Sequence, residues 1–439
     1  MATETAVINA SSGVQTFYTT YAAARSAASA GDLIQIWADL NEQIILKNEV
    51  DIWIAPGRVL DVSTAVPTIT DNNVSLVCSI YGNGIIKNTY TENYPTGPYY
   101  ECIKILHGGS KISIQCDSID GAGGVTPDTI DGSSVKVTDA SKFHLCCQTI
   151  INRSNTAIEI LNCSDINIQT KKIESGDNGS GNNGSPVVLL QGTGFISADE
   201  LICGGKGSCL DFKAGNITAN IIKITSLETE NAGYPTILLD DGSQNQNLIL
   251  YFDEIQNLNS NGGDAVKITE GIATLIGRRI YALNGMSVDL NNIIISALIQ
   301  SDEIISETKG INISNSDEQV IIDANYIEGS NGNDGVIRSA SGSNYLIRNA
   351  KITNTYTSSP SIGIYLDTGS QTIEIENLII VTGTETNDFS IFRNSTTNID
   401  IKNLGLFVKK AISMHITLKI GTGTGTGENF KYIISNDIT

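Results

Sequence analysis

Aspartates recur along the middle of the chain at intervals that could place them on one face of a repeating fold. Asp240 and Asp241 are adjacent, and Asp253 and Asp302 follow with two arginines between them. Pairs of carboxyl groups cleave glycosidic bonds, one acting as an acid and the other as a base or nucleophile. These four aspartates are therefore the candidate catalytic residues of a depolymerase, either a polysaccharide lyase or a glycoside hydrolase.

The spacing of the charged residues also has a purely structural interpretation. Glu200, Glu254 and Glu303 take equivalent places in successive repeats, with Ser226 and Arg279 between them. Opposite charges on neighbouring strands attract each other, whereas like charges directly opposite destabilise a sheet. A ladder of solvated charges explains the pattern without catalysis. We therefore expect no catalytic residue and keep the depolymerase as the alternative.

Tyrosines gather in a second stretch that could bind a ligand. Tyr90, Tyr94, Tyr99 and Tyr100 surround residues 95–98 (PTGP), where the repeat pattern loosens. Long loops on a rigid scaffold often carry binding residues, and aromatic faces suit sugar rings or a protein partner. We predict that these tyrosines bind a ligand, with local packing of the loop as the alternative.

The sequence predicts reduced cysteines and no metal site. All eight cysteines lie between Cys78 and Cys209, the chain has three histidines, and no Cys-x-x-Cys motif occurs. Zinc sites need closely spaced cysteine and histidine ligands, so neither a metal nor another cofactor is expected. Free cysteine behaves as a small hydrophobic residue in protein cores. Several cysteines fall at expected strand positions, namely Cys116, Cys146, Cys163 and Cys209.

One short phrase recurs through the chain and indicates which elements position these residues. Two polar or small residues precede a branched aliphatic residue, and the aliphatics are separated by about 23 to 28 residues over the most regular stretch. Extended in both directions, this ladder has about a dozen rungs, as a solenoid would. The predicted rungs are Ile119, Ile150, Ile173, Leu201, Leu227, Ile255, Ile280, Ile304, Ile327, Ile352, Ile379 and Leu404.

A second ladder of short alternating strands runs in register with the first. Apolar residues at every other position are typical of half-buried strands. Coils stacked at about 4.8 Å would pair each backbone group with the coils above and below and would bury the inward side chains. The predicted fold class is therefore all-β, a right-handed parallel β-helix of about a dozen coils. The strands of the second ladder are 158–160, 210–212, 266–268, 288–290, 311–313 and 364–366.

Three segments are expected along the chain. Residues 1–30 would form an N-terminal segment with a capping helix, because alanines and aromatic residues there have helical spacing. Residues 31–406 would form the β-helix, with loop insertions near 81–135 and 176–185. Residues 407–439 would form a short C-terminal tail that serves as a cap, an assembly element or an attachment segment.

The opening of the chain resembles the pectin-lyase-like β-helix proteins. An alanine-rich stretch over residues 15–30 precedes Gly-Asp at 31–32 and an alternating strand, and Asn-Glu-Gln at 41–43 leads into Ile-Ile-Leu at 44–46. In that family a helix caps the open end of the first coil. The resemblance implies the same role for the predicted helix and extends the fold to about residue 410.

The same resemblance allows a test for enzyme activity. Pectin-degrading hydrolases carry Asn-Thr-Asp, Asp-Asp, Gly-His-Gly and Arg-x-Lys motifs on consecutive coils, and only Asp240-Asp241 matches one of them. With no Gly-His-Gly in the chain, the hydrolase assignment fails. Pectate lyases resemble the fold too and need calcium-binding carboxylates beside an arginine base. The candidates for that role are Asp199, Asp253 and Asp302, with Arg278 or Arg279.

Charge and hydropathy exclude several other functions. The chain has 27 basic and 47 acidic residues and a net charge of −20. Nucleic-acid binding requires basic patches that neutralise phosphates, so no nucleic-acid partner is expected. No apolar run approaches the length of a membrane span, and the first 30 residues lack the pattern of a signal peptide. We expect neither membrane insertion nor export by the general secretory route.

These features favour a non-catalytic virion protein. The chain resembles the structural or receptor-binding β-helix proteins of phage tails, spikes and head fibres, which are made in the host cytoplasm. That resemblance implies a homotrimer that contacts other virion proteins and presents a rigid surface, which could bind a host-cell glycan. A bacterial cell-surface or extracellular location is the alternative.

Overall fold

A computed structural model describes most of the chain, which forms two compact units, Met1–Ile222 and Lys223–Thr439. The described residues are 4–64, 66–72, 74–89, 101–121, 133–152, 156–176, 188–205, 207–227, 233–240, 246–291, 296–314, 320–332, 334–340, 344–358, 361–367, 372–382, 389–393 and 398–408.

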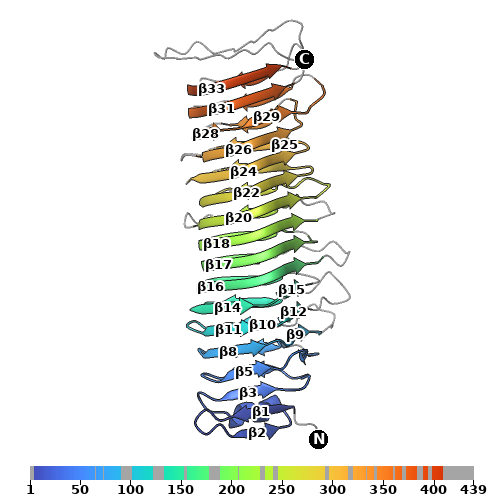
Figure 1. Cartoon of the computed structure of the whole chain (residues 1–439), viewed down its shortest axis with the longest axis vertical. Coiled ribbons are helices and arrows are strands. Elements are labelled where there is room, and N and C mark those ends of the chain that lie inside the picture. The colour runs from blue at the N-terminus through green and yellow to red at the C-terminus, as the bar shows by residue number, and fades with distance from the viewer. Residues whose placement is uncertain are drawn as a thin grey trace. The chain divides into compact units, whose positions relative to one another are not determined.

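The described part of the first unit contains one short helix and many strands that lie in successive layers (Figure 1). Its elements are β1 (Thr5–Ile8), β2 (Gln15–Tyr18), α1 (Tyr21–Ala27), β3 (Leu33–Ile36), β4 (Ile44–Ile45), β5 (Asp51–Ile54), β6 (Val59–Leu60), β7 (Ile69–Thr70), β8 (Val77–Gly82), β9 (Ile85–Asn88), β10 (Ile103–Ile105), β11 (Lys111–Gln115), β12 (Ser118–Gly121), β13 (Val135–Thr138), β14 (Lys142–Cys146), β15 (Thr149–Asn152), β16 (Ile158–Ser175), β17 (Val188–Cys203) and β18 (Leu210–Ser226), whose end belongs to the second unit.

The described part of the second unit consists of strands and connecting segments. Its strands are β19 (Ile237–Leu239), β20 (Gln246–Asn257), β21 (Val266–Ile268), β22 (Ile272–Ala282), β23 (Met286–Asn291), β24 (Ala297–Ser306), β25 (Lys309–Ser314), β26 (Val320–Gly329), β27 (Ile337–Ser339), β28 (Asn344–Arg348), β29 (Lys351–Asn354), β30 (Ile362–Leu366), β31 (Thr372–Thr382), β32 (Phe389–Arg393) and β33 (Asn398–Val408).

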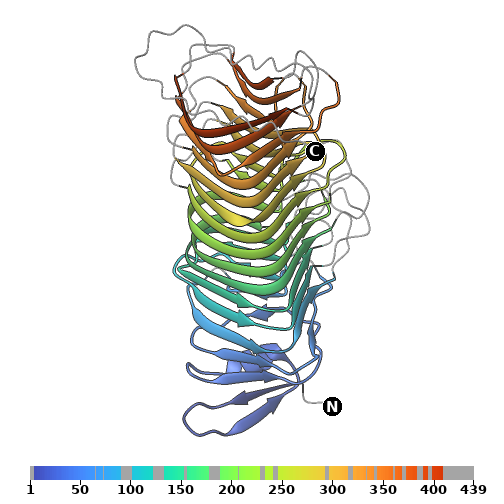
Figure 2. The same ribbon diagram turned by 45° about the horizontal axis from the view of Figure 1, so that its top comes forward.

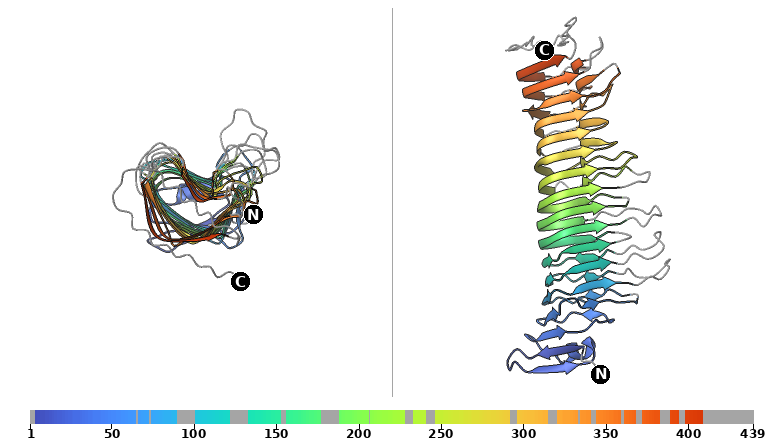
Figure 3. Two further views of the ribbon diagram at one scale, coloured as in Figure 1. Left: turned by 90° about the horizontal axis from the view of Figure 1, so that it is seen from above. Right: turned by 45° about the vertical axis from the view of Figure 1, so that its right-hand side comes forward.

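Parallel pairing between successive turns makes each unit a β-solenoid. In the first unit β8 pairs with β11 and β11 with β14, and in the second β20 pairs with β22 and β22 with β24. Figure 2 and Figure 3 show the same stacking within each unit from other directions. The chain has about 11 turns and almost no helix, which confirms the predicted all-β parallel solenoid. The right-handed sense stays a prediction.

The predicted aliphatic ladder forms a core in both units. Its members are buried and pair in register from turn to turn, so each inward side chain packs on a similar one. Full burial of one such side chain contributes about 1.5 to 3 kcal/mol. The confirmed runs are Ile119, Ile150, Ile173 and Leu201 in the first unit, and Ile255, Ile280, Ile304, Ile327 and Ile352 in the second.

Three predicted rungs of this ladder are wrong. Leu227 lies after β18 and is 44% exposed, whereas Ile224 within the strand is buried. Ile379 is 38% exposed, and its neighbour Ile380 takes the buried place. Leu404 lies two positions before the residue that pairs with Ile380. At residues 378–380 the consecutive apolar residues leave the face undecided, and a slip of one residue turns every side chain to the other face of a strand.

The second predicted ladder is also in register. Val266 pairs with Val288, Val288 with Ile311, and the series continues through Ile337 to Ile364. Because the apolar residues alternate with polar ones, each strand places one set in the core and the other outside. The outward residues of one turn therefore lie beside the outward residues of the next turn, in the same register as the core residues.

Buried asparagines close loops of unequal length at one corner of the solenoid turns. Asn88, Asn152, Asn257 and Asn354 each end a strand and are at most 6% exposed. Each side-chain amide donates to a backbone carbonyl further along the chain. The acceptor lies 13 residues after Asn88, 4 after Asn152, 7 after Asn257 and 8 after Asn354. The bond from Asn257 to Asp264, for example, is 2.9 Å long. Because the same kind of asparagine contact closes each loop, loops of different length can begin at equivalent places in the turn. The number of residues between successive rungs can therefore vary.

The N-terminal segment differs from the helix predicted over residues 15–30. Gln15–Tyr18 form strand β2, which pairs antiparallel with β1, and α1 covers only Tyr21–Ala27. Residues 16–18 are Thr, Phe and Tyr, which favour strands and so follow the hairpin in place of the helix. Thr20 caps α1, and the buried Tyr21 donates its hydroxyl hydrogen to the Ile45 carbonyl at 2.8 Å. The capping role of the helix stays a prediction.

All eight cysteines are free, as predicted, and seven are buried. Burial raises the pKa of Cys78 to about 12, which keeps its thiol neutral. Cys146 is the exception to the predicted core position, because it occupies an outward place on β14 and is exposed. Its neighbour Cys147 is buried at the following corner.

Some predicted features lie outside the described residues. These include residues 409–439 and the loop residues 90–100, 122–132 and 177–187. The last described strand, β33, runs to Val408. Among the described residues, no helix has the length and apolar character needed to cross a membrane.

Candidate functional site

The outward face of β8, β11, β14 and β16 holds a hollow of about 330 Å³ that opens to solvent. These strands belong to successive turns of the first unit and pair in parallel. Their inward isoleucines and leucine are buried, so the residues between them must point outwards. We name this surface the polar groove; its outward residues are Ser79, Tyr81, Ser113, Gln115, His144, Cys146, Asn167 and Gln169.

Side chains of the polar groove form two rows across the turns. Gln115, Cys146 and Gln169 pair in register, and Gln169 donates its amide to Asn167 at 3.3 Å. The Ser113 and Gln115 side chains have no hydrogen-bond partner among the residues that the structure describes. Hydroxyl and amide groups can both donate and accept, which suits the hydroxyl groups of a sugar. The other row consists of Ser79, Ser113, His144 and Asn167.

His144 lies in the middle of the polar groove. Its Nε2 lies 3.2 Å from Oδ1 of Asp165, a residue on the next turn. This contact fixes the orientation of the imidazole ring. The lining of the groove includes no carboxylate, whereas glycosidases require two of them around the scissile bond. The described side chains of the groove are therefore hydrogen-bonding and aromatic groups, which suit the binding of a ligand.

An aromatic row leads into the polar groove from the preceding turns. The Trp37 and Trp53 rings pack edge to face with centroids 4.8 Å apart, and Trp53 pairs with Tyr81 on the next turn. Trp37 is 45% exposed and Tyr81 is 37% exposed. Aromatic pairs of this kind are rigid, and their exposed faces can stack on apolar faces of a ligand.

The predicted catalytic aspartates have other partners or lie apart. Asp253 pairs with Arg278, with Oδ1 and Nε 2.8 Å apart, and this hydrogen bond holds the pKa of Asp253 below its usual value. Asp302 accepts a hydrogen bond from Asn325 at 2.9 Å. Asp240 is exposed after β19, and Asp241 lies outside the described residues. The structure thus does not gather the described members around one hollow, and their catalytic role stays a prediction.

The predicted ladder of alternating charges is present in the second unit. Glu254, Arg279 and Glu303 pair in register on successive turns. Arg279 lies 3.1 Å from Glu254 and 3.5 Å from Glu303, and Lys223 adds a contact of 3.9 Å to Glu254. The outward charges therefore neutralise one another along the stack.

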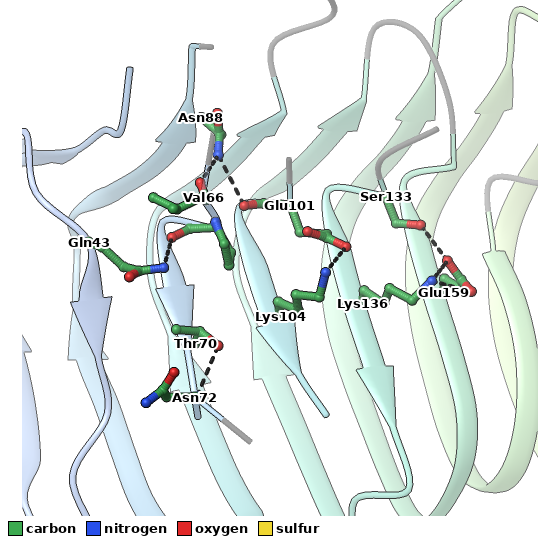
Figure 4. Close-up of polar contacts among 11 residues, drawn as sticks. Gln43, Val66, Thr70, Asn72, Asn88, Glu101, Lys104, Ser133, Lys136 and Glu159 are labelled. Atoms are coloured by element: carbon green, nitrogen blue, oxygen red, sulfur yellow. Dashed lines mark hydrogen bonds and ion pairs between the residues drawn. The ribbon is translucent and has the colours of Figure 1, made fainter. Parts of the chain in front are cut away.

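A partly buried charge cluster in the first unit was not predicted from the sequence (Figure 4). Glu101 is fully buried, 3.0 Å from Lys104, and burial raises the pKa of its carboxyl group. Lys104 pairs in register with Lys136, which contacts both carboxylate oxygens of Glu159 at 3.0 and 3.1 Å. Each lysine of the stacked pair thus has a carboxylate of its own, so the cluster is electrostatically balanced.

The predicted tyrosine site is not tested by the structure, and the aromatic row was not predicted from the sequence. Tyr90, Tyr94, Tyr99 and Tyr100 all lie outside the described residues, so their role stays a prediction. Trp53 had a usable signal, because it occupies the outward place in an alternating strand. Within the described part of the chain, no cluster of three or more His, Cys, Asp or Glu residues is placed to hold a metal ion.

Comparison with known proteins identifies no relative of this chain. No protein-family model, curated protein or solved structure significantly matches the chain.

Proposed function

We propose that this protein is a non-catalytic, receptor-binding β-solenoid that presents a rigid surface and binds a host-cell glycan in the polar groove. The observation that carries this proposal is the alignment of outward hydroxyl, amide and aromatic side chains over successive turns. A sugar chain offers repeated hydroxyl groups and apolar ring faces, which match those two kinds of side chain.

The proposed biological setting is a virion. The protein would be a tail spike, tail fibre or head fibre, with a right-handed coil capped by α1 at one end. It would assemble in the host cytoplasm as a homotrimer and contact other virion proteins. Support comes from the solenoid fold, the buried free thiols and the net charge of −20, which favours solubility.

Binding is favoured over cleavage by the chemistry of the polar groove. A glycoside hydrolase would need a pair of carboxyl groups about 5 to 9.5 Å apart. The described lining of the groove includes no carboxyl group, and Asp253 is held ionised by Arg278, which makes it a poor general acid. A polysaccharide lyase would need an arginine base beside carboxylates, and the described lining includes no arginine. The structure therefore offers no specific support for the depolymerase as a second function.

Glycan binding tests the proposal directly. We expect the full chain to bind members of an array of bacterial surface oligosaccharides without shortening them. Tyr81→Ala and Gln115→Ala should each weaken that binding by about tenfold, because each removes a contact inside the groove. Tyr251→Ala is the matched control, since Tyr251 is 44% exposed on β20 in the other unit.

Two results would contradict this proposal. One is the absence of binding to every glycan tested. The other is depolymerisation that Asp253→Asn or Asp302→Asn abolishes, which would establish the depolymerase instead.

A further inference from the structure

Two cysteines lie side by side on successive turns of the first unit. Gln115 at the end of β11 pairs in register with Cys146 at the end of β14, and the Cys116 N–H then donates to the Cys146 carbonyl at 3.1 Å. The residue after each strand is a cysteine, Cys116 after β11 and Cys147 after β14. These two are therefore direct neighbours across the turns, at the strand spacing of about 4.8 Å.

The side chains of this pair are also in contact. Both are buried, Cys116 with 4% and Cys147 with 5% of its surface exposed. The hydrogen bond between the two thiols and their burial raise the pKa of Cys116 well above its usual value. The Cα atoms of a disulfide are usually about 4.4 to 6.8 Å apart, and the strand spacing falls within that range. The two sulfur atoms can therefore bond with little movement of either turn.

The surroundings of the pair favour the chemistry of a dithiol. On the next turn the Cys147 thiol contacts the Thr170 hydroxyl at 3.8 Å, so the neighbour there is not a third cysteine. Structural zinc sites take four ligands, whereas the described residues form no cluster of three or more here. The preceding residues, Gln115 and Cys146, line the polar groove, which opens to solvent. A small oxidant can therefore approach the pair from the groove.

We infer that Cys116 and Cys147 form a redox-sensitive switch, a dithiol that becomes a disulfide bond between two successive turns. The oxidant is a small disulfide such as oxidised glutathione. One cysteine thiolate attacks it, which forms a mixed disulfide and releases one glutathione thiolate. The other cysteine thiolate then attacks the sulfur of the first cysteine and displaces the second glutathione. The two cysteines lose two protons and two electrons, and the oxidant gains them as two glutathione thiols.

The switch closes slowly and stabilises the fold once it is closed. Neutral thiols are poor nucleophiles, so the raised pKa of Cys116 keeps the pair reduced during brief contact with an oxidant. The closed bond joins two turns and restricts the unfolded chain. A protein made under reducing conditions therefore gains stability in an oxidising environment. This role is independent of glycan binding.

Peptide mapping by mass spectrometry tests the switch on the folded full chain. The chain would carry Cys146→Ser, because Cys146 is exposed and would share a peptide with Cys147. It is incubated with oxidised glutathione at about pH 8.5, where more of each thiol is ionised, and then digested without reduction after free thiols are blocked. We expect a disulfide-linked pair of peptides that contain Cys116 and Cys147. Dithiothreitol should separate them.

Urea unfolding connects the bond with stability. Oxidation should raise the urea midpoint of the Cys146→Ser chain, and dithiothreitol should reverse the shift. Adding Cys116→Ala should abolish this response. Adding Cys78→Ala instead is the matched control, because it removes a buried thiol whose contact is the Val50 carbonyl at 3.2 Å. The control should keep the response to oxidation.

Two results would overturn the inference. One is that Cys116 and Cys147 both stay reduced under conditions in which the exposed Cys146 of the original chain has acquired glutathione, because the oxidant was then active. The other is a bond between Cys116 and Cys147 that leaves the urea midpoint unchanged or lowers it, because the bond would then not stabilise the turns.

Discussion

Burial and pairing shift single carboxyl groups in opposite directions in the second unit. Burial raises the pKa of Asp264 to about 6, although the Met286 N–H donates to its Oδ1 at 2.8 Å. The hydrogen bond from Arg278 lowers the pKa of Asp253 instead. A carboxyl group with a raised pKa works against the folded state once it ionises, because the unfolded chain ionises it more readily.

Replacing Asp264 should therefore stabilise the protein at neutral pH. The favourable contribution of protonated Asp264 is complete below its unfolded pKa near 3.8 and is lost as pH rises through about 6. Asp264→Asn keeps an oxygen acceptor for the Met286 N–H and cannot ionise. We expect the variant to be more stable than the original protein by about 1 to 3 kcal/mol at pH 7.5, with little difference at pH 4.

Urea unfolding at several pH values checks this prediction. Asp302→Asn is the control, because Asp302 is exposed and bonded only through Asn325 in the described structure. The prediction fails if Asp264→Asn is less stable at pH 7.5, or if both variants show the same dependence on pH.

At the scale of strands, whether a side chain faces the core decides how much its substitution lowers the free energy of unfolding. Ile304 is fully buried between Ile280 and Ile327, whereas Ile379 is 38% exposed. Ile304→Ala should destabilise the protein by roughly 3 kcal/mol through lost burial and an unfilled cavity. Ile379→Ala should change stability by less than about 0.5 kcal/mol. Urea midpoints of the two variants measure the difference, and equal losses would show that the register of β31 is wrong.

Periodicity explains why the strands were predictable and where that prediction stopped. Ile255 and Ile352 each lie between two polar residues, so their inward direction follows from the sequence. The run Leu378, Ile379 and Ile380 has no polar residue to show which side faces the core. Near the N-terminus, alanines suggested a long helix, but pairing with β1 determined the structure of residues 15–18.

The candidate site was harder to predict than the core. Ser113, Gln115 and Asn167 are ordinary outward residues in sequence, and only the stacking of turns brings them together. The proximity of Ser113 to His144 likewise depends on a register across 31 residues of chain, with loop residues between them. Composition carries no signal for such a contact, because loop length decides which outward residues become neighbours.

At the scale of the whole molecule, a solenoid must protect its last turn. An end turn exposes unpaired backbone groups and core side chains, which promote edge-to-edge association unless another segment covers them. Among the described strands β33 pairs with β31 on one side. The sequence continues after it with the glycine-threonine repeat at 421–427 and a short apolar tail. We propose that this segment covers the end by joining three copies of the chain.

Removing the tail should therefore change the mass in solution. The chain has a mass of 46.7 kDa, so a trimer would have about 140 kDa. Light scattering should give that value for the full chain and a monomer mass for a version that ends before Gly421. A circular dichroism spectrum confirms that the shorter version keeps its strands. A monomer in both cases would contradict the trimer, and a trimer in both cases would place the contacts elsewhere on the solenoid.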